Sequence, residues 1–324
     1  MSSRAGGLLL FLVCQTGHAA NPLVSVTGSP LPDVLSDAAN RCDSIYVDLG
    51  SNVGVQPRAF FEPERYADNY MQPTFSAVFG DGEARRTSAC VFGFEAQPRL
   101  VSRLREIELC YAERGWRVRF DHAVALDADD TVVDIYSDVS SHEHFWGSGI
   151  SDALARGRSE LGVTVDAVPS VDIAKWIDEL LRAHRPSRVF IKMDIEGSEF
   201  VVLPRLHQRG LLCKDRVAAM DIEWHSLALA ELAQPYREGW AAFTSAGKMS
   251  LETKPALKPV FVNQPCGEGT DVVPFSTADQ LHDEVPLPCD NESRRRPEAP
   301  GDDSGSGEQS SDEAESKPTH CAAD

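Results

Sequence analysis

A short apolar strand that ends in a glycine-containing turn constrains the fold of this 324-residue chain more than any other feature. Residues 44–47 read Ser-Ile-Tyr-Val, and residues 48–54 read DLGSNVG. A helix is expected after the turn, toward Phe61. Strand, tight turn and helix in this order form the opening unit of a nucleotide-binding α/β sheet. The two glycines, Gly50 and Gly54, do not have the G-x-G-x-x-G spacing of dinucleotide-binding enzymes.

Strand and helix patterns then alternate along the chain. Further apolar strands are predicted at 90–95, 116–120, 131–136, 161–165, 188–194, 217–224 and 259–262. Helices are predicted at 100–111, after a cap at Ser170, from Gly197 to a kink or end near Pro204, and at 227–243. The segment 62–87, which contains prolines and glycines but little periodicity, is expected to be a loop insertion. This alternation predicts a doubly wound, mostly parallel sheet with helices on both faces.

The charge of the chain limits its partners. The formal net charge is -19, which argues against a nucleic-acid partner because phosphate backbones are bound by clustered Lys and Arg. From about residue 286 to 324 the chain is rich in Gly, Pro, Ser, Asp and Glu. Such a segment buries too little apolar surface to offset the entropy of ordering, so it is predicted to be a disordered acidic tail.

The N-terminus resembles a secretory signal peptide over residues 1–20. Arg4 precedes the apolar run 6–14, and small residues follow at Ala19 and Ala20. The run is too short to span a bilayer, so no stable membrane insertion is expected. A cleaved signal predicts the secretory pathway, either the Golgi lumen or the extracellular space, whereas an uncleaved leader or a transit sequence predicts a cytoplasmic or organellar protein. The seven cysteines beyond the leader have no C-x-x-C spacing and define no disulfide framework.

Acidic residues at strand ends indicate the kind of ligand. In an open parallel α/β sheet, ligands bind beyond the carboxyl ends of the strands. Asp48 lies at the tip of the first strand, and Glu95 ends the second, where an acid commonly accepts hydrogen bonds from ribose hydroxyls. Alternatively, the glycines merely permit the turn and Glu95 is a solvated loop residue. Taken together, the two strand ends predict an adenosine-type ligand.

Three segments resemble successive motifs of the FkbM-type methyltransferases: 45–54 (IYVDLGSNVG), 91–98 (VFGFEAQP) and 191–203 (IKMDIEGSEFVVL). The resemblance runs from about Ser44 to His225, and a domain of this type is expected over 40–265. It implies a Rossmann-like class I methyltransferase fold with a seven-stranded sheet and S-adenosyl-L-methionine as the methyl donor. It also implies transfer to an oxygen, with a small-molecule or glycan acceptor such as a sugar or a small hydroxylated metabolite.

The resemblance also assigns cofactor-binding residues by position. The turn residues would line the methionine side of the donor, Glu95 would hold its ribose, and two residues past the third strand would lie near the adenine. The turn residues are Asp48, Gly50, Asn52 and Gly54, and the last pair is Asp121 and His122.

Candidate catalytic residues follow two later strands. Asp194 is expected where donor and acceptor meet, with Glu196 facing the acceptor; alternatively, Glu196 and Glu199 are first-turn acids that favour the helix dipole. His225 follows another strand and is a candidate general base, because the ordinary pKa of histidine is near neutral; alternatively, it is a structural histidine. The role of Lys192 stays open between a solvated residue and an ion-pair partner.

Two hypotheses compete with this enzyme. A binding module of the same fold would keep the adenosyl pocket without acceptor chemistry, and a nucleic-acid methyltransferase is disfavoured by the charge and by the lack of an Asn-Pro-Pro-Tyr-like element. The stretch with His142, His144, Phe145 and Trp146 supplies no third ligand nearby, so no metal site is predicted. It is expected to be a surface loop or, alternatively, a lid over the acceptor.

Overall fold

The computed structural model describes residues 42–129, 131–138, 145, 147–150, 152, 156, 162–225, 275–276 and 287–289. The chain divides into two compact units, 1–286 and 287–324, and every element below belongs to the first. The predicted signal peptide, the strand at 259–262, the helix at 227–243 and nearly all of the predicted acidic tail lie outside the described residues. None of the helices described is long and apolar enough to cross a membrane.

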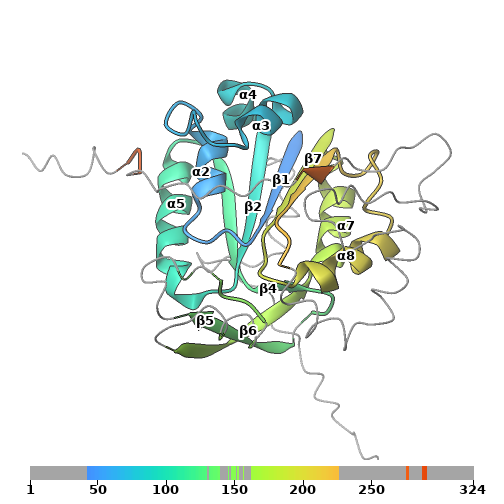
Figure 1. The fold of residues 1–324 in the computed structure, drawn as a ribbon. Coiled ribbons are helices and arrows are strands. Elements are labelled where there is room, and N and C mark those ends of the chain that lie inside the picture. Colours follow the sequence, from blue (N-terminus) through green and yellow to red (C-terminus); the bar gives the residue numbers. More distant parts are fainter. Residues whose placement is uncertain are drawn as a thin grey trace, which may run out of the picture. The chain divides into compact units, whose positions relative to one another are not determined.

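A parallel sheet of six strands forms the centre of the first unit, in the order β3-β2-β1-β7-β8-β9. Its strands are β1 (Ser44–Leu49), β2 (Ala89–Glu95), β3 (Arg117–His122), β7 (Arg188–Met193), β8 (Ala219–Ile222) and the two-residue β9 (Phe275–Ser276). The chain builds outward from β1 to β3 and then returns to the other side of β1 with β7 (Figure 1). This order confirms the predicted doubly wound parallel α/β fold, although the described residues of this sheet do not include a seventh strand.

Three more strands form a second sheet in the order β4-β6-β5: β4 (Val124–Leu126), β5 (Val132–Asp138) and β6 (Val163–Asp172). The strands predicted at 131–136 and 161–165 therefore exist, but they pair antiparallel with each other outside the main sheet. Sequence periodicity reports which residues are extended, whereas sheet membership depends on distant pairing partners.

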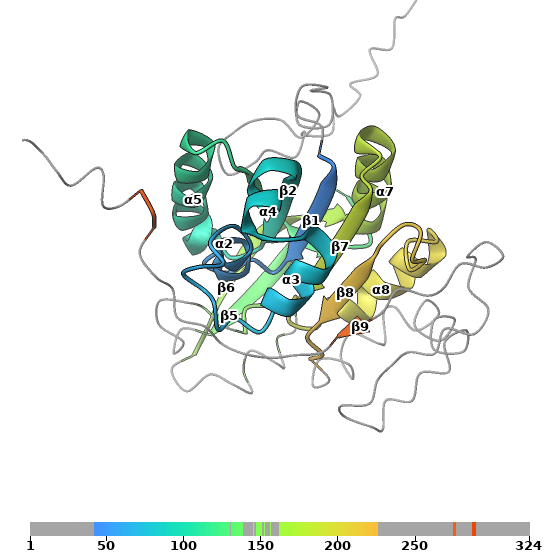
Figure 2. The same ribbon diagram turned by 90° about the horizontal axis from the view of Figure 1, so that it is seen from above.

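Helices cover both faces of the main sheet (Figure 2). On one side lie α2 (Val55–Phe61), α3 (Gln72–Phe79), α4 (Gly82–Ser88) and α5 (Val101–Glu113), which follows a short 3₁₀ turn η2 (Pro98–Leu100). On the other side lie α7 (Ile173–His184) and α8 (Glu199–Gln208).

The predicted loop at 62–87 is wrong, because this segment contains α3 and α4. Pro73 occupies the first turn of α3, where a missing N–H costs no intrahelical bond. Gly80 ends α3 with φ 87°, and Asp81 caps α4 by accepting a 2.9 Å hydrogen bond from the N–H of Ala84. The residues that suggested a loop are thus the starts and stops of two short helices.

Two predicted helix boundaries also change. Ser170 lies within β6, and α7 is capped instead by Asp172, whose Oδ1 accepts a 2.9 Å hydrogen bond from the N–H of Lys175. The helix after Gly197 does not end at Pro204 but continues to Gln208. Leu203 and Leu206, on either side of the proline, are buried in the core, and this packing holds the helix together through it.

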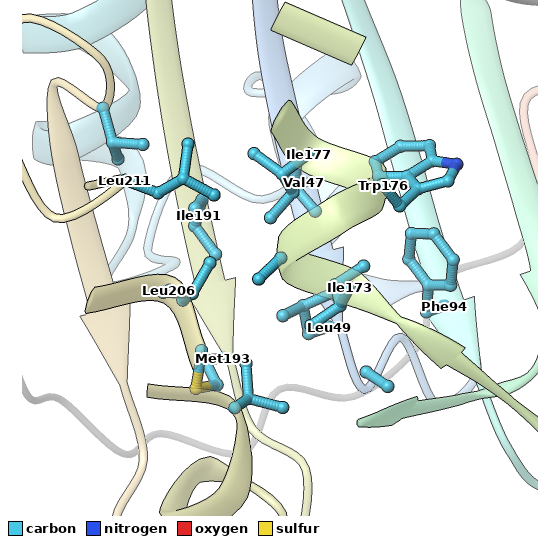
Figure 3. Close-up of a cluster of buried hydrophobic side chains, with 14 of the residues drawn as sticks. Val47, Leu49, Phe94, Ile173, Trp176, Ile177, Ile191, Met193, Leu206 and Leu211 are labelled. Carbon is cyan, nitrogen blue, oxygen red and sulfur yellow. The ribbon is translucent and has the colours of Figure 1, made fainter. Parts of the chain in front are cut away.

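The core on the α7 and α8 side is drawn in Figure 3. Val47 and Leu49 of β1 and Ile191 and Met193 of β7 lie among side chains of α7 and α8. The ring of Trp176 meets Phe94 edge-on, with centroids 4.9 Å apart. On the opposite face, Tyr46 of β1 packs against rings of α2 and α3. All six residues of β1 are buried, as expected for a central parallel strand.

A disulfide joins Cys42 to Cys90, at the start of two neighbouring parallel strands. It closes a loop with a sequence separation of 48 residues. In the chain-entropy account a loop of this length contributes about 4 kcal/mol to the free energy of unfolding. Cys110 and Cys213 are disulfide-bonded as well.

Candidate functional site

A cavity opens beyond the carboxyl ends of β1, β2 and β7, next to the point where the strand order reverses. Five of the predicted site residues line it: Gly50, Asn52, Glu95, Asp194 and Glu196. The described lining does not include the other five, which are Asp48, Gly54, Asp121, His122 and His225.

The turn after β1 fits against the end of β7 so closely that only glycine can occupy position 50. Gly50 has φ 80°, and a Cβ atom there would lie 1.7 Å from the carbonyl oxygen of Asp194. The N–H groups of Gly50 and Ser51 both donate to the carbonyl oxygen of Phe94, each at 3.0 Å. The ends of three neighbouring strands are therefore tied together at one edge of the cavity.

Glu95 is held in place by backbone donors. Its Oε2 accepts a 2.6 Å hydrogen bond from the N–H of Asn52, and its Oε1 accepts a 2.7 Å bond from the N–H of Gln97. Burial raises the pKa of the Glu95 carboxyl to about 7, although both N–H groups favour the ionised form. A carboxylate oxygen accepts more than one hydrogen bond, so each oxygen can also receive a hydroxyl of a ligand.

Two residues predicted to bind the cofactor, Asp48 and Gly54, stabilise the glycine turn and are not among the described lining residues. Gly54 has φ 83°, and a Cβ atom there would lie 2.6 Å from Cδ1 of Ile107, so glycine lets the turn pack against α5. Asp48 is fully buried, and its Oδ1 accepts a 2.7 Å hydrogen bond from the hydroxyl of Tyr46.

The two residues predicted to lie near the adenine, Asp121 and His122, instead contact other groups of the protein. The carboxylate of Asp121 is held by the guanidinium of Arg119, with Nη2 3.0 Å from Oδ1. Nε2 of His122 lies 3.1 Å from the carbonyl oxygen of Ala96. The lining near the end of β3 comes from Ala123 and Val124, whose small apolar side chains suit the face of an aromatic ring.

Lys192, whose role the sequence left open, connects two edges of the cavity. Its Nζ donates to the carbonyl oxygen of Gly50 at 2.9 Å and to Oδ2 of Asp194 at 3.1 Å. Lys192 lies between Asp48 of β1 and Asp221 of β8 in the sheet register. Burial acts to lower the pKa of Lys192, but the neighbouring carboxylates of Asp194 and Asp48 raise it overall, so the side chain is a buried cation.

His225 lies within a cluster of carboxylates. Its Nε2 is 3.2 Å from Oε2 of Glu196 and 3.4 Å from Oε1 of Glu223, and its Nδ1 is 3.3 Å from Oε1 of Glu199. Burial acts to lower the pKa of His225, but the nearby carboxylates of Glu199 and Glu223 raise it to about 11. So high a pKa argues against a neutral-pH general base, because the imidazole would already carry its proton; the catalytic role of His225 stays a prediction.

Several residues that line the cavity were not predicted from the sequence. Glu223 follows β8, a strand end that could have identified it, and Gln56 opens α2 just beyond the glycine turn. Tyr70 comes from the segment predicted to be a loop, and its hydroxyl donates to Oδ2 of Asp221 at 3.2 Å. By contrast, Phe145 and Ser148 come from the stretch expected to be a surface loop or an acceptor-binding lid.

A doubly wound α/β domain with an acid-lined cavity at its strand switch point belongs to the broad class of nucleotide-type ligand-binding folds. Residues 48–247, well over half of the chain, match the family model of the methyltransferase FkbM domain. The chain therefore belongs to the FkbM methyltransferase family, as its sequence motifs predicted, and this membership indicates a methyltransferase. Searches among curated proteins and among solved structures found no match.

Proposed function

We propose that this protein transfers the methyl group of S-adenosyl-L-methionine to a hydroxyl oxygen of a sugar, a glycan or a small metabolite. The observation that supports this most is Glu95, whose carboxylate is oriented toward the cavity by two backbone N–H groups at the strand switch point. In this proposal Glu95 accepts the ribose hydroxyls of the donor.

The remaining donor contacts follow from the lining. Gly50 and Asn52 lie where the backbone can approach the methionine part of the donor, and Ala96, Ala123 and Val124 offer an apolar surface to the adenine. Asp48 and Gly54 act indirectly in this arrangement, since they hold the turn rather than contact the ligand.

The charge of the cavity supports the choice of acceptor. Among the described lining residues are four carboxylates, those of Glu95, Asp194, Glu196 and Glu223, and one buried cation, Lys192. A negative cavity attracts the positively charged sulfonium of the donor and repels phosphorylated acceptors. An uncharged acceptor with hydroxyl groups fits this environment, and a nucleic-acid backbone does not.

The chemistry needs mainly positioning. The acceptor oxygen forms a bond to the methyl carbon while the carbon–sulfur bond breaks and its electron pair stays on sulfur. The oxygen also loses its proton, for which Asp194 and Glu196 are the candidate residues at the cavity wall. Holding the oxygen in line with the methyl group supplies most of the remaining rate enhancement.

Replacing Glu95 by alanine is expected to weaken binding of S-adenosyl-L-methionine by roughly 1–3 kcal/mol, because ribose hydroxyls would lose their acceptor in a closed site. Isothermal calorimetry on folded protein measures this. Glu106→Ala is the matched control, since the Glu106 side chain is 61% exposed on α5 and should not affect donor affinity. Equal affinity in wild type and Glu95→Ala would remove the donor assignment.

Transfer itself is tested with labelled donor and a panel of sugars and hydroxylated metabolites. A methylated oxygen in the product supports the proposed reaction. Tight donor binding with no transfer to any acceptor, including those in a cell extract, would instead favour the non-catalytic binding module.

We further propose that the mature protein resides in the secretory pathway. The Cys42–Cys90 disulfide supports this, since such bonds persist in oxidising compartments and are rare in the cytosol. N-terminal sequencing of the purified native protein is expected to start near residue 21, after the small residues Ala19 and Ala20. A chain that still begins at Met1 or Ser2 would contradict the signal peptide.

A further inference from the structure

Two side chains at the wall of the cavity and a buried histidine beside them are arranged like the ligands of a metal ion. One ligand atom from each of Asp194, Glu196 and His225 lies within 4.8 Å of the others. Nε2 of His225 is 3.2 Å from Oε2 of Glu196 and 3.8 Å from Oδ1 of Asp194. Atoms that share a cation at about 2.1 Å are roughly 3–4 Å apart, so these distances suit a common ion. We propose that Asp194, Glu196 and His225 bind a divalent cation.

The burial of His225 and the lack of a hydrogen bond between its Nε2 and the described residues are a second, independent observation for this site. The residue is only 5% exposed, and its Nε2 is buried yet makes no hydrogen bond of acceptable geometry with any described residue. Buried polar atoms are nearly always hydrogen-bonded, so such an atom needs an explanation. Carboxylate oxygens of Glu196 and Asp194 lie 3.2 and 3.8 Å from Nε2, close enough to share an ion with it.

The other ring nitrogen, Nδ1, contacts a carboxylate, as the second nitrogen of a metal-binding histidine commonly does. Nδ1 lies 3.3 Å from Oε1 of Glu199, and this oxygen also accepts a 2.7 Å hydrogen bond from the backbone N–H of His225. Glu199 is fully buried. A carboxylate that receives the second ring N–H fixes the tautomer and leaves Nε2 as the ligand atom.

The local charge also favours a cation. Glu196, Glu199 and Glu223 surround the imidazole, and Asp194 lies beside it. Among the described residues, Lys192 offsets part of this charge through its contact with Oδ2 of Asp194, which leaves Oδ1 directed at His225. A divalent ion would offset the remaining negative charge more completely than one protonated imidazole does.

The ligand types indicate the kind of ion. One imidazole nitrogen with two carboxylate oxygens suits a first-row divalent cation of mixed nitrogen and oxygen preference, such as Mn²⁺, better than a thiolate-binding metal. Its open positions would face the cavity, where the cation can hold an acceptor hydroxyl and favour loss of its proton. This catalytic role rests on the proposed function, whereas cation binding does not.

The ligands come from the segments that follow β7 and β8, which are separated in sequence by α8. Asp194 and Glu196 lie on one segment and His225 on the other, so no local motif shows the site. The sequence therefore predicts no metal site here, because ligands from two distant segments form no local pattern.

Titration of the full chain with Mn²⁺ alone, after removal of metals by a chelator, tests the site by calorimetry. Wild type is expected to bind one Mn²⁺ per chain, and His225→Gln and Glu196→Gln are each expected to weaken this binding at least 10-fold. Glu106→Gln, with an exposed side chain on α5, is the matched control and should bind like wild type. Weak binding to the acidic C-terminal residues would be the same in all four proteins.

If His225→Gln fails to fold, Glu196→Gln still decides, because the Glu196 side chain is partly exposed at the cavity wall. Equal Mn²⁺ affinity in wild type and the folded variants would overturn the proposal, as would a wild type that shows only the weak binding. The titration contains no methyl donor, so its failure leaves the proposed methyl transfer untouched. Conversely, failure of methyl transfer leaves a measured cation site intact.

Discussion

Gly50→Ala is expected to lower the free energy of unfolding by about 3–5 kcal/mol. The added Cβ atom would lie 1.7 Å from the carbonyl oxygen of Asp194 and 2.8 Å from its carbonyl carbon, and these backbone atoms cannot rotate away. Relief would require the ends of β1 and β7 to separate. That movement would break the hydrogen bond from the N–H of Asp194 to the carbonyl oxygen of Leu49 and the bond from Lys192 to Gly50.

Gly115→Ala is the control that distinguishes the steric clash at Gly50 from the conformational cost of placing alanine at a positive φ. Gly115 has φ 74°, close to the 80° of Gly50, but no described atom lies within 4 Å of where its Cβ would be. It should therefore show only the conformational cost, about 1–2 kcal/mol. Urea unfolding of both variants measures the difference. Equal costs in the two variants would show that the backbone at Gly50 relaxes and that the close approach to β7 does not constrain this position.

The contact between Gly50 and Asp194 shows why the position of the cavity could be predicted from the sequence. Glycines and acids lie at the ends of β1, β2 and β7, and parallel strands bring these ends together, so Gly50, Glu95, Asp194 and Glu196 could be placed from local patterns. Asn52 was placed by the family resemblance. The uniformly apolar strands also made the parallel sheet predictable. Both inferences depend on properties that a residue and its near neighbours carry in the sequence.

The residues whose roles changed depend on distant partners. Asp48 points toward Tyr46 rather than into the cavity, and the side of the strand on which the ligand lies is not a local property. From the sequence alone, His225 would be given the ordinary pKa of a histidine. In the fold, the carboxylates of Glu199, Glu223 and Glu196, which come from separate segments, raise that pKa and favour the charged imidazole. Only the assembled strand ends show that this histidine belongs to a charged cluster.

Lys192→Met is expected to lower the free energy of unfolding by about 3–5 kcal/mol, measured by urea unfolding with a chelator present. Lys192 is only 6% exposed and lies between two acidic neighbours in the sheet, Asp48 and Asp221. Methionine fills a similar volume but removes the positive charge. The fully buried Asp48 would then lose its compensating charge, and Gly50 and Asp194 would lose their hydrogen-bond donor.

Lys175→Met is the matched control, because Lys175 also pairs with an aspartate, Asp129, but its side chain is 45% exposed. Water screens such a pair, so its loss should cost less than about 1 kcal/mol. A second comparison tests the electrostatic cause: Asp48→Asn should recover part of the loss in the Lys192→Met background, because it removes a buried negative charge left without its cation. If Lys192→Met proved as mild as Lys175→Met, the buried cation would not be needed to hold the acidic strand ends together. A severe loss that Asp48→Asn leaves unchanged would assign the effect to the hydrogen bonds with Gly50 and Asp194 instead.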